Sequence, residues 1–183
     1  IGKTEKKAIS QLEKLIKKYR GSYMEADLLL RLAELYMRRA KSALFFEINR
    51  QSEDMVSLMP KKVTSQSSKT YVKKAISIYD KIQARFPNFA SMDMVLFNEA
   101  MACQQVGYDK KAVGLYWKLI NNHKNSLLVP DAYLAIGEID FKNKKFDKAL
   151  ARFNSIKKYP NSRAYPYALY KAGWSHYNLR DTM

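Results

Sequence analysis

The sequence predicts an all-α solenoid in which antiparallel helix pairs stack on one another, and three observations point to this fold class. Apolar residues recur at three- and four-residue spacing, as they do on the buried face of an amphipathic helix. The six Gly and five Pro are too few for the many tight turns of a β-sandwich. A block of about 37 residues recurs along the chain, which is typical of repeat architectures.

One recurring element predicts the second helix of each pair. It reads Lys-Ala-aliphatic, with a large apolar residue four places after the alanine, and its copies contain Ala8, Ala75, Ala112 and Ala149. These alanines are 67, 37 and 37 residues apart, so one repeat carries an insertion of about 30 residues. Three of the large residues, Tyr79, Tyr116 and Phe153, are expected to fill the wedge between helices.

A second recurring element predicts the first helix of each pair. In it a small residue follows an apolar one by four places, as in Leu29 with Ala33, Leu96 with Ala100, Tyr133 with Gly137 and Leu169 with Gly173. Small residues on both helices of a pair allow close approach of their backbones. A bulky residue at Gly137 or Ala149 is therefore expected to overpack the seam between the two helices.

Turn residues between these elements set the expected boundaries. We predict helices at about 3–19, 22–48, 69–86, 90–107, 109–123, 127–142, 145–159 and 163–179. The chain is then a single solenoid over 1–183: the second helix of a preceding repeat at 1–20, repeats at 21–87, 88–124 and 125–160, and a further first helix at 161–183. Because both end helices would lack a partner, we expect a fragment of a longer protein with further repeats on both sides.

The pattern resembles the tetratricopeptide repeat family, whose repeat holds an aromatic residue, a Leu-Gly pair and a Tyr, followed by Ala, Phe and Pro. The best copy reads Tyr133, Ile136-Gly137, Ala149, Phe153 and Pro160, with Asp140 where the family has Tyr. The resemblance covers the whole chain except the insertion. It implies a right-handed superhelix that binds other proteins, without catalytic residues, cofactor or small-molecule substrate.

The linker between the last two repeats narrows the resemblance. Residues 157–162, Lys-Lys-Tyr-Pro-Asn-Ser, are similar to the Tyr-Pro-x-Ser linkers of Gram-negative envelope repeat proteins, as is the helix start at 168–174. Examples are the BamD-like outer-membrane assembly lipoproteins and the YbgF-like cell-division coordinators, and the long repeat proteins of gliding and predatory bacteria are also similar. This resemblance implies a periplasmic or envelope location, with the cytoplasm as the alternative.

In this family the first helices line a concave groove that binds a partner peptide or helix. Transfer by position predicts a groove lined by Arg31, Glu34, Met94, Phe97, Asn98, Met101, Gln105, Glu138, Tyr170, Lys171 and Trp174, with Met37 on the same face. The Lys and Asn pair with which some members grip a C-terminal carboxylate is absent. The apolar members of this set have another interpretation: Met94, Phe97 and Met101 as helix core, and Tyr170, Trp174 and Tyr177 as a face that awaits a following helix.

A strong positive charge suggests an alternative function. The formal net charge is +16, and Lys7, Lys74, Lys111 and Lys148 occupy one repeat position, which predicts a basic edge. Such an edge would suit an anionic partner, whether nucleic acid, lipid headgroups or an acidic protein. Lysines solvated at surface turns are an equally ordinary explanation of the same pattern.

Nothing in the sequence indicates a chemical site. His123 and His176 lack the neighbouring ligands that a metal ion needs, and no Gly-rich phosphate loop is present. Cys103 is the one cysteine, so no internal disulfide forms, and a buried inert thiol is its expected role. No apolar stretch reaches the ~18 residues of a membrane span.

The insertion, near 49–68, is rich in Ser, Gln and Lys, which favours disorder or mobility. It also contains an apolar cluster that could fold into the groove or dock a partner: Met55, Val56, Leu58 and Met59.

Overall fold

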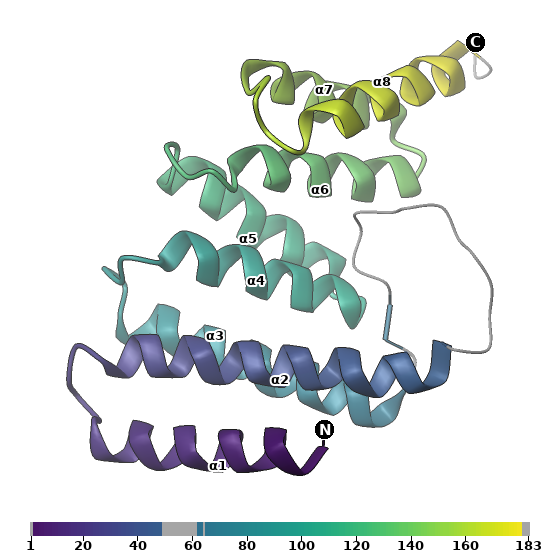
Figure 1. Cartoon of the computed structure of the whole chain (residues 1–183). Coiled ribbons are helices and arrows are strands. Elements are labelled where there is room, and N and C mark those ends of the chain that lie inside the picture. The colour runs from purple at the N-terminus through teal and green to yellow at the C-terminus, as the bar shows by residue number, and fades with distance from the viewer. Residues whose placement is uncertain (1, 49–61, 64, 181–183) are drawn as a thin grey trace. The chain divides into compact units, whose positions relative to one another are not determined.

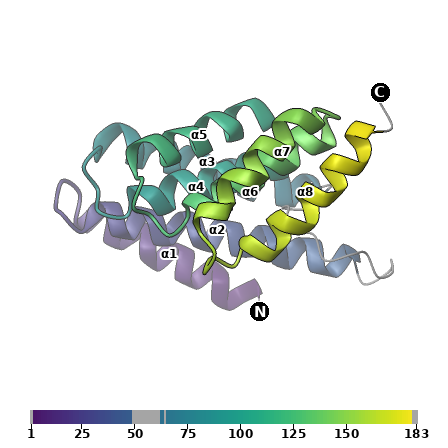
Figure 2. The same ribbon diagram turned by 90° about the horizontal axis from the view of Figure 1, so that it is seen from above.

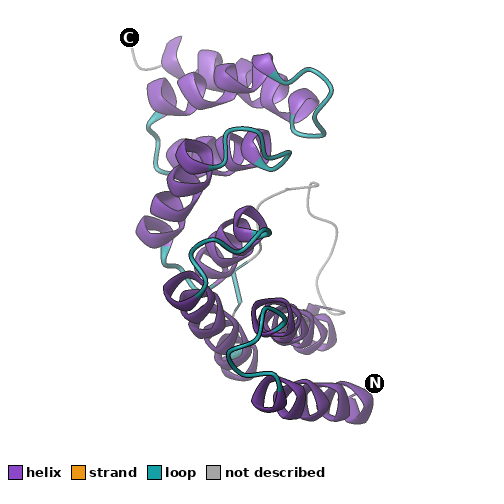
Figure 3. Cartoon of the chain, turned by 90° about the vertical axis from the view of Figure 1, so that its left-hand side faces the viewer, coloured by secondary structure: helices purple, strands orange, loops and turns teal. Residues whose placement is uncertain are grey.

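A computed structural model of the chain describes residues 2–48, 62, 63 and 65–180 (Figure 1). The described residues form α1 (Gly2–Lys18), α2 (Glu25–Ile48), α3 (Gln66–Arg85), α4 (Met92–Gln105), α5 (Asp109–Asn122), α6 (Val129–Lys142), α7 (Phe146–Ser155), the short 3-10 helix η1 (Ile156–Lys158) and α8 (Tyr165–Arg180). Figure 3 shows helices and loops, and no strand, among these residues. The predicted all-α helical repeat is confirmed.

Every predicted helix is present, and the boundaries agree to within about three residues. The largest differences have local causes. Helix α3 begins at Gln66 rather than 69 because the Ser65 side chain accepts a hydrogen bond from the backbone N–H of Ser68 and caps the helix. The last turn of the predicted helix 145–159 is the 3-10 helix η1. Most of the predicted insertion, including its apolar cluster, lies outside the described residues.

The chain falls into two compact units, Ile1–Tyr108 with α1 to α4 and Asp109–Met183 with α5 to α8. In the first unit α1 packs on α2, α2 on α3, and α3 on α4. In the second unit α5 packs on α6, α6 on α7, and α7 on α8 (Figures 1 and 2). The second helices α3 and α7 therefore each have two packing faces, one for the helix before and one for the helix after.

The seam between α6 and α7 has the close approach that the small residues predict. A Cβ atom built on Gly137 of α6 would lie 2.5 Å from Cε1 of Phe153 on α7. Phe153 is itself buried, and so are the equivalent side chains Tyr79 and Tyr116. The alanines of three second helices, Ala75, Ala112 and Ala149, are fully buried. The predicted wedge role is thus confirmed for Phe153, and the predicted burial for Tyr79 and Tyr116.

The same turn precedes each of four first helices. The backbone N–H groups of Ser22, Phe89, Ser126 and Ser162 donate to the carbonyl oxygens three residues earlier, at 2.9–3.1 Å. In two of these turns a serine hydroxyl donates to the same oxygen: Ser22 Oγ to Tyr19 at 2.7 Å and Ser162 Oγ to Tyr159 at 2.8 Å. The repeated turn sets the residue at which each first helix begins. The starting residue in turn determines which side chains of that helix are exposed.

A buried ion pair joins the start of α2 to the end of α3. The Glu25 side chain is fully buried and accepts hydrogen bonds from both terminal nitrogens of Arg85, with 2.9 Å between Nη2 and Oε2. The backbone N–H of Gly21 donates to Oε2 of the same carboxylate at 2.7 Å. The charged group is thereby held at the entry of α2 by three donors.

Candidate functional site

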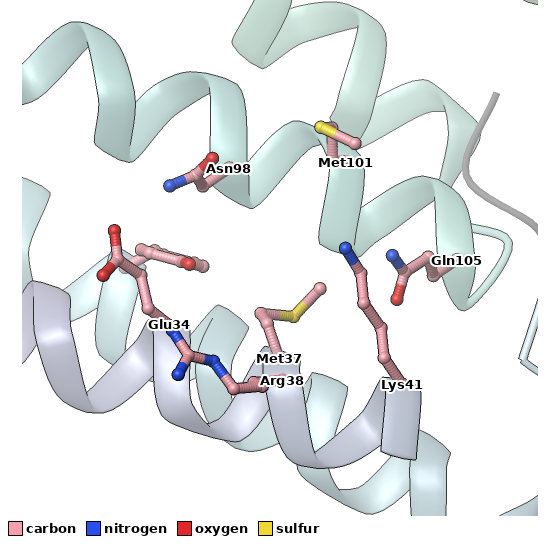
Figure 4. A pocket seen from close by; sticks show the side chains of 8 residues that line it. Glu34, Met37, Arg38, Lys41, Asn98, Met101 and Gln105 are labelled. Carbon is pink, nitrogen blue, oxygen red and sulfur yellow. The ribbon is translucent and has the colours of Figure 1, made fainter. Parts of the chain in front are cut away.

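A hollow with a volume of about 430 Å³ opens between α2 and α4 of the first unit (Figure 4). It is lined by Glu34, Met37, Arg38 and Lys41 from α2, by Tyr79 from α3, and by Asn98, Met101 and Gln105 from α4. The α2 and α4 residues recur at three- and four-residue spacing, so each set lies on one face of its helix. Helix periodicity therefore builds the site.

The floor of the hollow is apolar and adaptable. Met37 from α2 and Met101 from α4 face each other across it in Figure 4, and both are half-buried. Tyr79 of α3, which is almost fully buried, also lines the hollow. Burial first, and then the negative charges of Glu34 and Glu99, raise the pKa of Tyr79 far above its ordinary value, so its hydroxyl stays protonated. A flexible thioether surface of this kind accepts apolar side chains of varied shape.

The rim of the hollow is polar and holds two cations, one carboxylate and two amide groups. Arg38 and Lys41 are exposed on α2, and Figure 4 shows the Lys41 amine reaching across toward Gln105 of α4. Asn98 and the half-buried Glu34 line the opposite end. Amide groups can donate to and accept from a peptide backbone, while the two cations favour an acidic side chain at the rim.

The end of the insertion is held beside this hollow. The backbone N–H of Val63 donates to the carbonyl oxygen of Gln105 at 2.9 Å, and the Val63 side chain is buried. The last turn of α4 thus gains a partner for one of its carbonyl groups. The sequence did not predict this contact, and a lone valine before the serine cap is too weak a signal to have revealed it.

Five of the residues predicted on the groove face come together in the hollow: Glu34, Met37, Asn98, Met101 and Gln105. Arg31 and Met94 are exposed on the same two helices. The prediction of Phe97 as a groove residue is wrong, because its side chain is 9% exposed and belongs to the core, like Leu30 and Leu134 at the same repeat position. Arg38, Lys41 and Tyr79 are lining residues that the prediction missed, although the four-residue step from Glu34 and Met37 would have indicated the first two.

In the second unit the corresponding stretch is occupied by an ion pair. The Glu138 carboxylate of α6 lies 3.6 Å from Lys171 Nζ of α8, and Nζ also lies 5.3 Å from the centre of the Phe141 ring. Burial raises the pKa of Glu138, and the Lys171 charge opposes that rise only in part. These two predicted groove residues are therefore brought together, but they contact each other rather than an open hollow.

The raised pKa of Glu138 makes a pH-dependent stability prediction. The folded chain binds the Glu138 proton more tightly than the unfolded chain does, so protonated Glu138 adds to the free energy of unfolding. This contribution is fully present below pH 4.5, the usual pKa, and is lost as pH rises through the folded-state pKa of Glu138. We expect Glu138→Gln to remove that fall. Urea unfolding of both proteins across this pH range is the measurement, and parallel curves would contradict the assignment.

The aromatic members of the predicted groove lie on the exposed face of α8. Tyr170 and Trp174 pack edge to face with ring centres 6.3 Å apart, and Trp174 and Tyr177 do so at 5.9 Å. With Leu169 and Gly173 these rings border a shallow hollow of about 550 Å³. This face is exposed in the second unit. Such exposure agrees both with a partner-binding groove and with a face that awaits a following helix.

The predicted basic edge has mixed local surroundings. Lys7 and Lys74 belong to the first unit and Lys111 and Lys148 to the second, and all four are exposed. Lys74 Nζ lies 5.5 Å from the centre of the Tyr36 ring and 6.0 Å from that of Tyr71, two rings that stack on each other. Lys74 thus has a local structural role. The continuous basic edge stays a prediction.

The structure also bears on the cysteine, on metal ligands and on membrane-spanning helices. The Cys103 side chain is buried in α4, as predicted. Across residues 2–48, 62–63 and 65–180, no group of three or more His, Cys, Asp and Glu side chains is placed to hold a metal ion. Within those same ranges, no helix has the length and apolar character that crossing a membrane requires.

Comparison with known families bears on the second unit. A family model described as tetratricopeptide repeat matches residues 131–162. Residues 131–162 are thus similar to a tetratricopeptide repeat. The matched residues span nearly all of α6, α7 and the turn that leads toward α8, which is the copy that fits the family pattern best in the sequence. Tetratricopeptide repeats generally mediate protein–protein interaction and typically act as non-catalytic scaffolds. A search of the curated proteins found no match to the chain.

Proposed function

We propose that the chain is a non-catalytic interaction scaffold that binds a segment of a partner protein in the hollow between α2 and α4. The observation that carries this proposal is the hollow itself, where Met37 and Met101 form an apolar floor on two consecutive first helices. Protein grooves that bind helices or extended peptides combine such a floor with a polar border.

The chemistry of the hollow indicates what kind of segment fits. A leucine- or phenylalanine-sized side chain can enter between the two methionines, because thioethers adjust their rotamers to the guest. The Asn98 and Gln105 amides line the hollow and can bond main-chain groups beside it, and the exposed Lys41 amine favours a neighbouring Asp or Glu. The partner segment is therefore apolar with an acidic flank.

The setting that we propose is a periplasmic or envelope assembly of a Gram-negative bacterium. The linker at 159–162 supports it, since its Tyr-Pro-Asn-Ser sequence is similar to the linkers of BamD-like and YbgF-like repeat proteins. In this chain the linker serine bonds the tyrosine carbonyl oxygen at 2.8 Å, which gives the Tyr-x-x-Ser spacing a structural purpose. Cell fractionation with an antibody against the natural protein tests the location, and recovery in the cytosolic fraction would refute it.

A charge placed on the floor is the direct test of the groove. We expect Met101→Glu to weaken partner capture at least about tenfold, because it sets an unpaired carboxylate against the apolar anchor of the partner. Ala84→Glu is the matched control: it adds the same carboxylate at an exposed position of α3 that does not line the hollow. The measurement is quantitative mass spectrometry of envelope proteins retained on each immobilised variant, followed by titration calorimetry with the partner segment.

Two outcomes of that experiment would contradict the groove. Equal capture by wild type and Met101→Glu, with helicity unchanged in circular dichroism, would remove the hollow as the binding site. Capture that survives Met101→Glu but falls steeply with salt would favour the alternative, a basic adaptor that holds an anionic partner through its lysines.

A further inference from the structure

A second hollow, with a volume of about 600 Å³, lies among α1, α2 and α3 of the first unit, and we call it the three-helix groove. Its apolar residues come from all three helices: Ile16, Leu29, Leu32, Tyr36 and Ile78. Its polar residues come from α1 and α3: Glu13, Lys17, Lys74, Ser77 and Lys81. The α2 residues are buried, whereas Ile16 and Ile78 are half-buried. Helix α2 therefore forms the floor, and α1 and α3 form the walls.

The three-helix groove and the hollow between α2 and α4 use different faces of α2. The α2 residues that line the groove are Leu29, Leu32 and Tyr36. Those that line the hollow are Glu34, Met37, Arg38 and Lys41. At 3.6 residues per turn, the two sets are centred about half a turn apart around the helix axis. A segment bound in one place therefore leaves the other accessible.

In the second unit the equivalent place is filled by side chains. Helices α5, α6 and α7 hold the repeat positions of α1, α2 and α3, and the counterparts of Glu13, Leu29 and Ile78 are Trp117, Tyr133 and Arg152. The Trp117 and Tyr133 rings pack edge to face with 5.9 Å between their centres, and Cζ of Arg152 lies 4.8 Å from the centre of the Trp117 ring. Trp117 thus contacts both other helices, at positions where the shorter side chains of the first unit border an open groove.

The border of the three-helix groove is positively charged. Lys17, Lys74 and Lys81 are exposed there, against the one carboxylate of Glu13. The Tyr36 hydroxyl donates a hydrogen bond to Oε1 of Glu13 at 3.1 Å, so this carboxylate is already engaged within the unit. Lys74 and Lys81 are two helical turns apart, which at 1.5 Å per residue is about 10 Å along α3. About three residues of an extended peptide span the same distance.

This combination of groups fits an acidic peptide better than other anionic partners. Proteins that bind single-stranded nucleic acid stack bases on aromatic faces, whereas the Tyr36 ring is buried and stacks on Tyr71. Membrane surfaces are bound through apolar side chains that project outward, whereas Ile16 and Ile78 are half-buried beside a hollow. A peptide with an apolar side chain between carboxylates satisfies both the floor and the lysines.

We propose that the three-helix groove is a second docking surface for a protein partner, and that it takes a short acidic segment with one leucine- or phenylalanine-sized side chain. That side chain lies between Ile16 and Ile78. The carboxylates that flank it pair with Lys17, Lys74 and Lys81. The scaffold can then hold two partner segments at once, because the groove shares no residue with the hollow between α2 and α4.

Selection from a library of short random peptides displayed on phage tests the proposal. The library is selected on the full chain and depleted on Ile78→Arg, and we expect the retained peptides to share a Leu, Ile or Phe flanked by Asp or Glu. Fluorescence polarisation of a labelled synthetic copy then measures affinity. We expect Ile78→Arg to weaken binding at least about tenfold although it adds a cation, because the new side chain occupies the groove at the repeat position of Arg152.

Matched variants separate the shape of the groove from its charge. Ala84→Arg adds the same cation at an exposed position of α3 outside the groove and is expected to bind the peptide at least as tightly as wild type. Ile78→Trp fills the groove without a charge and is expected to act like Ile78→Arg. Lys17→Gln is expected to weaken binding about two- to fivefold, since it removes one exposed ion pair. Circular dichroism checks that each variant is folded.

Three results would overturn the proposal. The first is a selection in which no peptide prefers wild type to Ile78→Arg. The second is a set of retained peptides without acidic residues. The third is a loss of binding in Ile78→Arg for duplex DNA or phosphatidylglycerol vesicles but not for the peptide, since the partner would then belong to another class. Capture through the hollow is measured separately with Met101→Glu, so failure of the groove and failure of the proposed function are distinguishable.

Discussion

Gly137→Leu is expected to destabilise the second unit by about 2–3 kcal/mol. The first added carbon would lie 2.5 Å from the Phe153 ring, closer than non-bonded carbons approach. Phe153 is 1% exposed and held between α6 and α8, so its ring has no free space into which to rotate. Leucine favours a helix over glycine by less than about 1 kcal/mol, which offsets only part of the clash.

Chemical denaturation followed by circular dichroism measures this effect, with Gly114→Leu as the control. Gly114 lies inside α5 with nothing within 4 Å, so the same substitution there is expected to stabilise the chain by about 0.5–1 kcal/mol. Adding Phe153→Ala to Gly137→Leu removes the clashing ring, so the two changes together should cost less than the sum of their separate effects. Equal effects of leucine at Gly137 and Gly114 would refute close packing at this seam.

Arg85→Ala is expected to destabilise the first unit by about 2–4 kcal/mol. Glu25 is fully buried, and removing Arg85 leaves its carboxylate with the Gly21 N–H as its remaining partner among the bonds described above. A buried charge that loses its counter-charge is one of the costliest changes in a protein. The Arg85 side chain is itself 36% exposed. Because water already screens part of the ion pair, the expected loss of stability is smaller than for a fully buried pair.

The same ion pair has a signature in the pH dependence of stability. Burial opposes ionisation of Glu25, but hydrogen bonds from Arg85 and Gly21 and the charges of Arg85 and Lys81 outweigh it and hold the Glu25 pKa below its usual value. This contribution is present above the unfolded-state pKa of 4.5 and is lost as pH falls through the folded-state pKa. In acid, Arg85→Ala should therefore lose less stability than wild type. Urea unfolding between neutral and acidic pH measures the difference, and Arg85→Lys tests whether two donors are needed.

The fold could be predicted from the sequence because its main determinants are local and repeated. Ala112 and Ala149 occupy equivalent positions, and both are fully buried. The spacing of small and large residues encodes which faces meet, so no long-range information was needed to pair consecutive helices. The start of α3 was missed by three residues because one serine hydroxyl decides it.

The candidate site could be predicted only in part because helix rotation decides which apolar residues face the core. Phe97 and Met101 are four residues apart and lie near each other on α4, yet the first is in the core and the second lines the hollow. A pattern of apolar and polar residues does not separate two such neighbours. Tyr79 was expected as a wedge between helices and also lines the hollow.

The lone thiol of Cys103 gives this chain an internal reporter of its own opening. The sulfur is fully buried in α4, one turn from the end that the Val63 backbone contacts, and the chain has no second cysteine to compete for a reagent. An alkylating probe added to the native protein can react only when α4 separates from its neighbours. The labelling rate therefore reports transient opening of the first unit without any engineered residue. A ligand bound between α2 and α4 is expected to lower this rate.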